Sequence, residues 1–109
     1  MRVAFATEGE GGLEAKISEV FSRADSITVL DVNEKVELVK VVENPAKDYK
    51  FGTGPIMVKT LVDLGAEVAV GARFGVGASS LLKDKGIRIV TVKAGTKVKD
   101  AIEAVKGQG

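Results

Sequence analysis

Residues 67–80, EVAVGARFGVGASS, join a short apolar run to a glycine-rich turn that opens into a helical pattern. The run at 67–70 is typical of a buried strand, and SSLLKDKG at 79–86 predicts a helix ending at Gly86. A second apolar run, IRIVTV at 87–92, follows directly. Strand, helix and strand in this order predict a parallel pair joined by a right-handed crossover, which is the mark of an α/β fold.

The segments before this unit predict three more strands. RVAFA at 2–6 is apolar after its first residue and indicates a buried strand. SITVLDV at 26–32 and KVELVKVVE at 35–43 are β-branched runs separated by two residues, which favours an antiparallel hairpin.

The second strand of this hairpin has no clean polar face. Strict alternation puts one set of side chains on one face (Val36, Leu38, Lys40 and Val42) and a second set on the other (Glu37, Val39, Val41 and Glu43). Since both faces carry apolar residues, we expect part of each to be covered.

Three helices complete the pattern, besides one or two helical turns within residues 16–25. Pro55 suits the first turn of a helix, and Gly65 suits its left-handed end. The second helix follows the glycine-rich turn. Thr96 can cap the last helix, whose apolar positions are Val98, Ala101, Ile102 and Val105.

Together these elements predict a five-stranded mixed sheet in the order 3-2-1-4-5, with strand 2 antiparallel and helices on both faces. The 109 residues suit one domain spanning 1–109 and are enough to form one core.

The composition excludes several kinds of chemistry. The chain has no Cys and no His, so disulfides, thiolate or imidazole metal ligands and Cys nucleophiles are ruled out. A net charge of +1 without a basic block or aromatic platform argues against nucleic-acid binding. No apolar run approaches the ~18 residues of a membrane helix, and the first residues do not resemble a signal peptide. We therefore expect a cytoplasmic protein that binds no membrane.

A ligand crevice is expected where connections leave the sheet in opposite directions, between the first and fourth strands. Three glycine-bearing loops are predicted to meet there: TEGEGG from Thr7 to Gly12, FGTGP around Gly52 and Gly54, and GARFGVG. Backbone N–H groups at Gly75 and Gly77, with the helix dipole behind them, can bind an anion. Arg73 adds a charged donor next to them.

A purely structural role for the glycines of GARFGVG has equal weight, because glycines at strand ends often only adopt a positive φ. The motif GVGASS departs from G-x-G-x-x-G, and no Gly-Lys-Ser/Thr occurs, so dinucleotide and P-loop sites are disfavoured. The loop carboxylates Glu8, Glu10 and Glu14 favour solvated positions over a cation site. We also predict that Phe21 and Met57 lie in the core. Tyr49 and Phe51 are predicted to anchor loops.

Several stretches resemble one family in order along nearly the whole chain: ISEVFSRAD, VVENPA, GTGP, the segment around GARFGVG and the final AGTKVKDAIEAVK. This is the dinitrogenase iron-molybdenum cofactor biosynthesis family, the small domain of NifX-like carriers and of the C-terminal part of NifB. The resemblance implies a ribonuclease H-like fold and the handling of an iron–sulfur-type cofactor or its precursor. The matched site glycines are Gly52, Gly54, Gly71, Gly75 and Gly77.

The family pattern SEHFGRA falls on residues 18–24, where Val20 replaces the histidine and Ser22 the glycine. An iron–sulfur or iron–molybdenum cluster would therefore be held through its own ligands, by backbone N–H groups and by Arg23 or Arg73. The cofactor-binding residues predicted in total are Thr7, Gly12, Arg23, Gly52, Gly54, Arg73, Gly75 and Gly77, with no metal-ligating residue among them.

The expected function is that of a carrier for an anionic cofactor, not an enzyme. A protein-interaction or regulatory module, or an anion-binding domain outside nitrogen fixation, is the alternative. A nuclease is excluded, because the centre of the first strand offers Val3, Ala4 and Phe5 where a two-metal site needs a carboxylate. A hydrolase using Lys or Glu as base lacks a paired nucleophile.

Two Asn and one Gln beside abundant Lys, Arg and Glu are typical of a hyperthermophile. We predict a thermal midpoint above about 65 °C, the upper end of the usual mesophile range. Differential scanning calorimetry measures this midpoint, and a value within the mesophile range would contradict the interpretation.

Overall fold

β1 (Arg2–Thr7) lies at the centre of a five-stranded sheet in the computed structural model, which describes residues 1–107. β1 pairs with β2 (Ser26–Val32) antiparallel and with β4 (Val68–Gly71) parallel. β3 (Val36–Glu43) and β5 (Arg88–Thr91) form the edges, so the order is β3-β2-β1-β4-β5. The predicted order and the antiparallel second strand are confirmed, and the architecture is consistent with a ribonuclease H-like fold.

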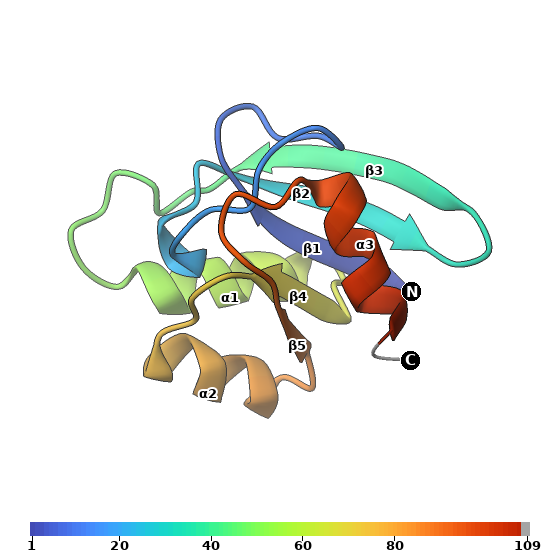
Figure 1. The fold of residues 1–109 in the computed structure, drawn as a ribbon. Coiled ribbons are helices and arrows are strands. Elements are labelled where there is room, and N and C mark those ends of the chain that lie inside the picture. Colours follow the sequence, from blue (N-terminus) through green and yellow to red (C-terminus); the bar gives the residue numbers. More distant parts are fainter. Residues whose placement is uncertain (108–109) are drawn as a thin grey trace.

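The central strand is buried on both faces, and its two faces differ in side-chain size. Ala4 and Ala6 face α1 (Thr53–Asp63) and α2 (Val76–Asp84), while Val3 and Phe5 face α3 (Val98–Gly107). Figure 1 shows α3 on one side of the sheet and the other two helices on the opposite side. The small side chains allow α1 and α2 to pack close to the sheet, whereas the larger ones fill the space under a single helix.

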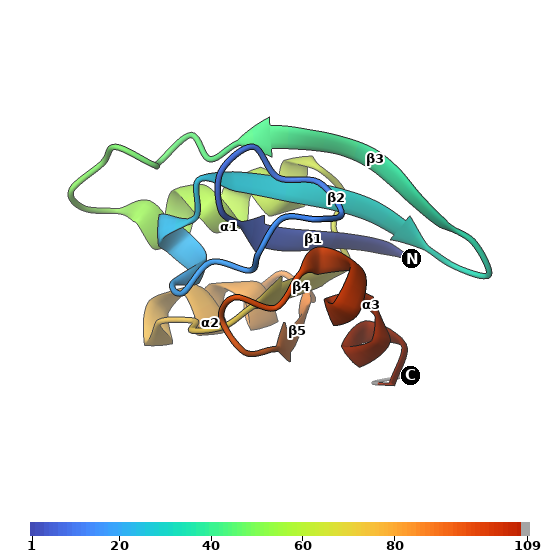
Figure 2. The same cartoon turned by 45° about the horizontal axis from the view of Figure 1, so that its top comes forward.

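Both α1 and α2 begin at the end of the sheet where β1 and β4 finish, and the two views agree on this placement (Figures 1 and 2). The arrangement follows from the parallel strands, because each crossover helix runs back against the strand that precedes it. A single 3₁₀ turn, η1 (Phe21–Arg23), lies at the same end and contacts α1. The core predictions for Phe21 and Met57 are confirmed, since both are buried.

The edge strand β3 departs from the predicted alternation. Val29 pairs with Lys40, but Leu30 pairs with Leu38, so Val39 is an extra residue in a β-bulge. Side chains beyond the bulge change face, and the predicted grouping of the strand by strict alternation is therefore wrong. Most of β3 is exposed, so the expected covering of both faces is limited to the half-buried Val41 and Val42.

The loop after β1 turns back over β2 and β3 on the α3 side of the sheet. The N–H of Gly12 donates to the hydroxyl of Thr28 at 3.0 Å. A Cβ atom at Gly11 would lie 2.6 Å from Val41 Cγ1 and 2.7 Å from Thr28 Oγ1. Gly11 also has a φ of +74°. Both the close approach and the left-handed backbone therefore require glycine at this position.

Asp25 ties the start of this loop to the sheet. Its Oδ2 atom accepts the N–H of Gly9 at 2.7 Å, and its Oδ1 atom lies 3.5 Å from Lys47 Nζ. The Gly9 hydrogen bond, with a further contribution from Lys47, lowers the pKa of the Asp25 carboxyl below its usual value. The carboxylate form of Asp25 therefore stabilises the folded loop.

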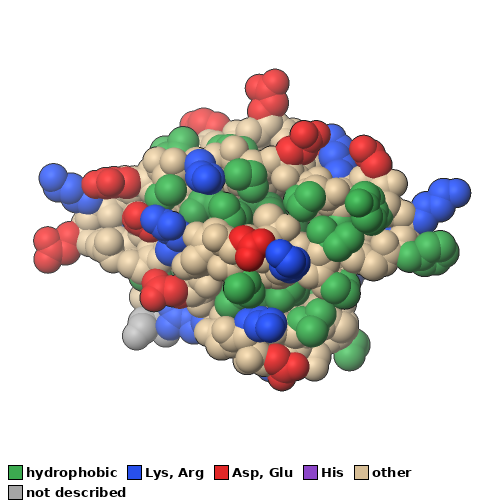
Figure 3. Space-filling model, turned by 180° about the vertical axis from the view of Figure 1, so that it is seen from behind, with side chains coloured by type: hydrophobic (Ala, Val, Ile, Leu, Met, Phe, Trp, Pro, Cys, Tyr) green, Lys and Arg blue, Asp and Glu red, His purple; other side chains and the backbone are tan. Residues whose placement is uncertain are grey.

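The surface seen in Figure 3 mixes charges of both signs with small hydrophobic groups, and no single-sign region covers it. Within residues 1–107, no helix has the length and apolar character needed to cross a membrane.

Replacing Gly11 with alanine is expected to destabilise the protein by about 1–2 kcal/mol from backbone strain and by a further ~1–3 kcal/mol from overpacking. Gly9→Ala is the matched control, because Gly9 also has a positive φ but nothing lies within 4 Å of its added methyl group. Urea unfolding measures both. Equal losses for the two variants would contradict the proposed close contact.

Protonation of Asp25 is expected to loosen the loop in acid. Because the folded pKa is depressed, the stabilising effect is complete above the unfolded pKa and is lost as pH falls through the folded pKa, below about pH 4. Asp25→Asn should therefore lower stability at neutral pH and flatten the loss of stability in acid. Urea midpoints between pH 7 and pH 3 measure this, and an unchanged pH profile would contradict it.

Candidate functional site

The first turns of α1 and α2 meet at the carboxyl end of the parallel strands. A methyl group at Gly54, in the first turn of α1, would lie 3.8 Å from Ala78 Cβ and 3.9 Å from Ala78 N in the first turn of α2. We call the surface formed by Gly52, Gly54, Gly75 and Gly77 the glycine rim. The structure thus brings together two of the three glycine loops that the sequence predicted to converge.

Neither helix has a side-chain cap at the glycine rim. The N-cap residues are Gly52 and Gly75, neither N-terminus has a side-chain hydrogen bond, and no acidic residue lies in either first turn. In α3, by contrast, Asp100 lies in the first turn. The first N–H groups of a helix have no partner within the helix. Two sets of N–H donors with aligned dipoles therefore face the same surface, a geometry suited to an anion.

The glycines in this region have different structural roles. Gly52 needs glycine for its φ of +74°. A Cβ at Gly71 would lie 3.0 Å from the ring of Phe74, which packs on Phe21 with ring centroids 4.7 Å apart. Structural reasons therefore explain why Gly52 and Gly71 are glycines, and for Gly71 this is one of the two roles that the sequence left open.

Gly75 and Gly77 have no such structural explanation. Neither has a positive φ, and nothing lies within 4 Å of a Cβ atom built on either residue. Alanine would fit both positions, and at Gly77, within α2, it would favour the helix, since Gly costs roughly 0.5–1 kcal/mol relative to Ala within a helix. The fold therefore does not require glycine at these two exposed positions at the start of α2.

Arg73 lies next to this surface on the β4–α2 loop. Its guanidinium lies 3.4 Å from Glu19 Oε1, and both side chains are more than two-thirds exposed. An ion pair of this kind contributes little to stability and is readily exchanged. The backbone is fixed more firmly, because the carbonyl of Arg73 accepts the N–H of Phe21 at 2.9 Å. The position of Arg73 is therefore fixed, while its charge remains available to a ligand.

Arg23, a predicted cofactor-binding residue, donates hydrogen bonds that the sequence did not predict. Its Nη1 and Nη2 atoms donate to the carbonyls of Tyr49 and Lys50 at 2.9 and 3.1 Å. These bonds hold the loop that leads into α1, so Arg23 helps to position Gly52. The positive charge of Arg23 interacts with the two carbonyl dipoles.

Asn44, at the start of the loop that leads into α1, bonds back to the segment around η1. It is 2% exposed, and its Nδ2 donates to the carbonyls of Ser22 and Ala24 at 3.2 and 2.9 Å. Sequence reasoning noted the motif VVENPA without assigning a role to Asn44. The sequence did contain a signal for this role, a single Asn before a Pro in a loop, because such a residue commonly bonds nearby backbone groups.

Thr7 and Gly12 do not lie at the glycine rim. Thr7 is fully buried, and its hydroxyl contacts the hydroxyls of Ser26 and Thr28 at 2.7 and 3.0 Å. Gly12 lies over β2 on the α3 side, whereas α1 and α2 pack on the other side. The first glycine loop therefore forms a separate part of the surface.

Exposed apolar side chains flank the glycine rim. Phe51 is 86% exposed and Val76 is 90% exposed, and each is adjacent to an N-cap glycine. Tyr49 is also exposed, although its backbone N–H donates to Ala46. The predicted anchoring of the loop by the Tyr49 and Phe51 side chains is wrong, since backbone contacts from Arg23 and Asn44 supply it.

The described residues offer no group of three or more carboxylate ligands that could hold a metal ion. Glu14 pairs with Lys97 and Lys99, and the hydrogen bond from Lys99 holds the pKa of the Glu14 carboxyl below its usual value. The donors present at the glycine rim are amides and a guanidinium. These groups can hold an anion, or a metal cluster that brings its own ligands.

Comparison with known proteins gives one family over nearly the whole chain. A sequence profile described as dinitrogenase iron-molybdenum cofactor matches residues 1–108. The comparison with curated proteins found no match.

Two solved structures illustrate the similarity. The apo form of the orange protein from Desulfovibrio gigas is 28% identical with a TM-score of 0.87, over 98% of this chain and 88% of that one. An NMR structure from Thermotoga, of a protein provisionally named as NifB, is 33% identical with a TM-score of 0.76, over 97% of this chain and 87% of that one. With the profile match, these similarities show that the chain belongs to the dinitrogenase iron-molybdenum cofactor family.

Proposed function

We propose that this protein is a cytoplasmic carrier, not an enzyme, which binds an anionic metal–sulfur cofactor or its precursor at the glycine rim. The observation that carries the proposal is the pair Gly75 and Gly77, two glycines that neither backbone conformation nor packing requires. Their absent side chains leave the free N–H groups of α2 open to a ligand's close approach. Family membership supports a metal–sulfur cofactor as the ligand.

The chemistry of the glycine rim suits a cargo that is exchanged. A chain without Cys or His offers no thiolate or imidazole to replace a ligand of the cluster. Amide N–H groups can bond to the outer sulfur or oxygen atoms of a cluster, and Arg73 can balance part of its negative charge. Binding of this kind forms no covalent metal–protein bond, so the cargo can be released intact to an acceptor.

A protein partner at the same surface is the second candidate function. Phe51 and Val76 are the observation that favours it, because these two exposed apolar side chains flank the same surface, and apolar groups gathered on one surface mark interaction sites. A partner that covers them would close the glycine rim, which suits a protein that delivers or receives the cargo.

Gly77→Ala separates the binding role from a structural one. The variant is expected to unfold at a higher urea concentration, with a gain of about 0.4–1 kcal/mol, because alanine has less conformational freedom to lose on folding. It should also retain several-fold less iron and sulfide than the wild type after anaerobic reconstitution. Iron and sulfide analysis after gel filtration measures retention.

Ser80→Ala, at an exposed position further along α2, is the matched control and should bind as the wild type does. No retained iron in the wild type, or equal retention by the wild type and Gly77→Ala, would overturn the proposal.

A further inference from the structure

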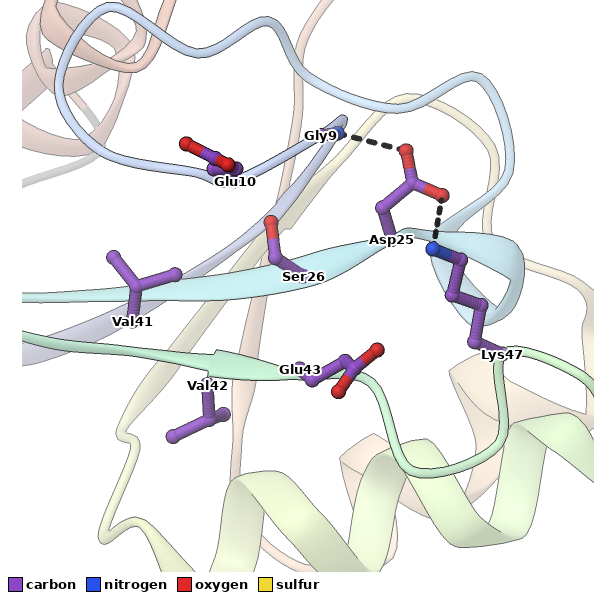
Figure 4. Close-up of a pocket in the computed structure, with 8 residues that line it drawn as sticks. All are labelled: Gly9, Glu10, Asp25, Ser26, Val41, Val42, Glu43 and Lys47. Atoms are coloured by element: carbon purple, nitrogen blue, oxygen red, sulfur yellow. Dashed lines mark hydrogen bonds and ion pairs between the residues drawn. The ribbon is translucent and has the colours of Figure 1, made fainter.

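A cavity of about 490 Å³ lies apart from the glycine rim, under the loop after β1 and against the end of β3. Its volume falls within the range of small-molecule sites, roughly 300–1,000 Å³. Figure 4 shows the loop residues Gly9 and Glu10 on one side and the strand residues Val41, Val42 and Glu43 on the other. We call this space the edge cavity.

Two of the charged groups that line the edge cavity already neutralise each other. Asp25 bonds to Gly9 N–H at 2.7 Å and lies 3.5 Å from Lys47 Nζ. Ser26, at the base, is 3% exposed and bonds to Thr7. These groups hold the walls together and leave little charge for a ligand.

The two remaining charged groups are Glu10 and Glu43. Among the interactions of residues 1–107, neither side chain makes an ion pair or a hydrogen bond. They belong to different walls, Glu10 to the loop and Glu43 to β3, and the half-buried Val41, which faces the loop, provides apolar surface between these walls. The edge cavity therefore presents two separated negative charges joined by an apolar surface.

This distribution favours an extended cation over a compact one. A metal ion needs several oxygens converging on one point, and no such group occurs within the described part of the chain. An aliphatic polyamine has ammonium groups separated by methylene chains, which matches separated carboxylates with valine surface between them. We propose that the edge cavity is a binding site for a linear aliphatic di- or polyamine, with Glu10 and Glu43 each pairing with one ammonium group.

Isothermal titration with spermidine at low salt tests the assignment. We expect saturable one-to-one binding of spermidine, with an affinity that falls as added salt screens the charges. n-Butylamine, which has a single ammonium group, should bind much more weakly. Each of Glu10→Gln and Glu43→Gln should weaken spermidine binding by about two- to fivefold, the range of exposed ion pairs. The double variant should lose about the product of the two factors.

Glu37→Gln is the matched control, since Glu37 is an exposed carboxylate on β3 outside the edge cavity. It should bind spermidine as the wild type does. Amide shifts on spermidine addition should concentrate at Gly9, Glu10 and Val41–Glu43. Three results would each overturn the proposal: no binding, equal loss in Glu37→Gln, or Mg²⁺ displacing spermidine at equal concentration. The glycine rim is intact in these variants, so iron retention is independent of the outcome.

Discussion

The parallel pairing of β1 with β4 is the constraint on which the rest of the structure depends. It places a crossover helix before β4 and another after it, on the same face of the sheet, and both helices must start at the carboxyl end of the strands. Ala4, Ala6 and Ala69 on that face let both helices pack closely. The close approach of Gly54 to Ala78 follows from this arrangement, and so does the meeting of two uncapped helix N-termini.

Element order and strand order could be predicted from the sequence because they depend on periodicity and connection rules that act locally. The β3 bulge could not, since Val39 fits the alternating pattern as well as its neighbours do. Only the pairing with β2 shows that one residue is extra. The direction of the loop after β1 was equally inaccessible, because it depends on Gly11 fitting against Thr28 and Val41, which lie in other strands.

The candidate site was partly predictable for the same reason. Gly52, Gly54, Gly75 and Gly77 lie at helix starts, which local patterns reveal, and Arg73 is adjacent in sequence. Arg23 has a charge that suggests ligand binding, but its hydrogen bonds to Tyr49 and Lys50 come from a loop more than 20 residues away. Its partners, and hence its positioning role, depend on tertiary structure.

The central claim is that free helix N–H groups at the glycine rim bind an anion. The most direct measurement is amide chemical-shift mapping during titration with small inorganic anions at constant ionic strength. The account predicts saturable shifts that concentrate at Gly54 and at Val76–Ala78. Shifts spread over lysine-rich surfaces, or confined to the loop after β1, with those amides unchanged, would contradict it.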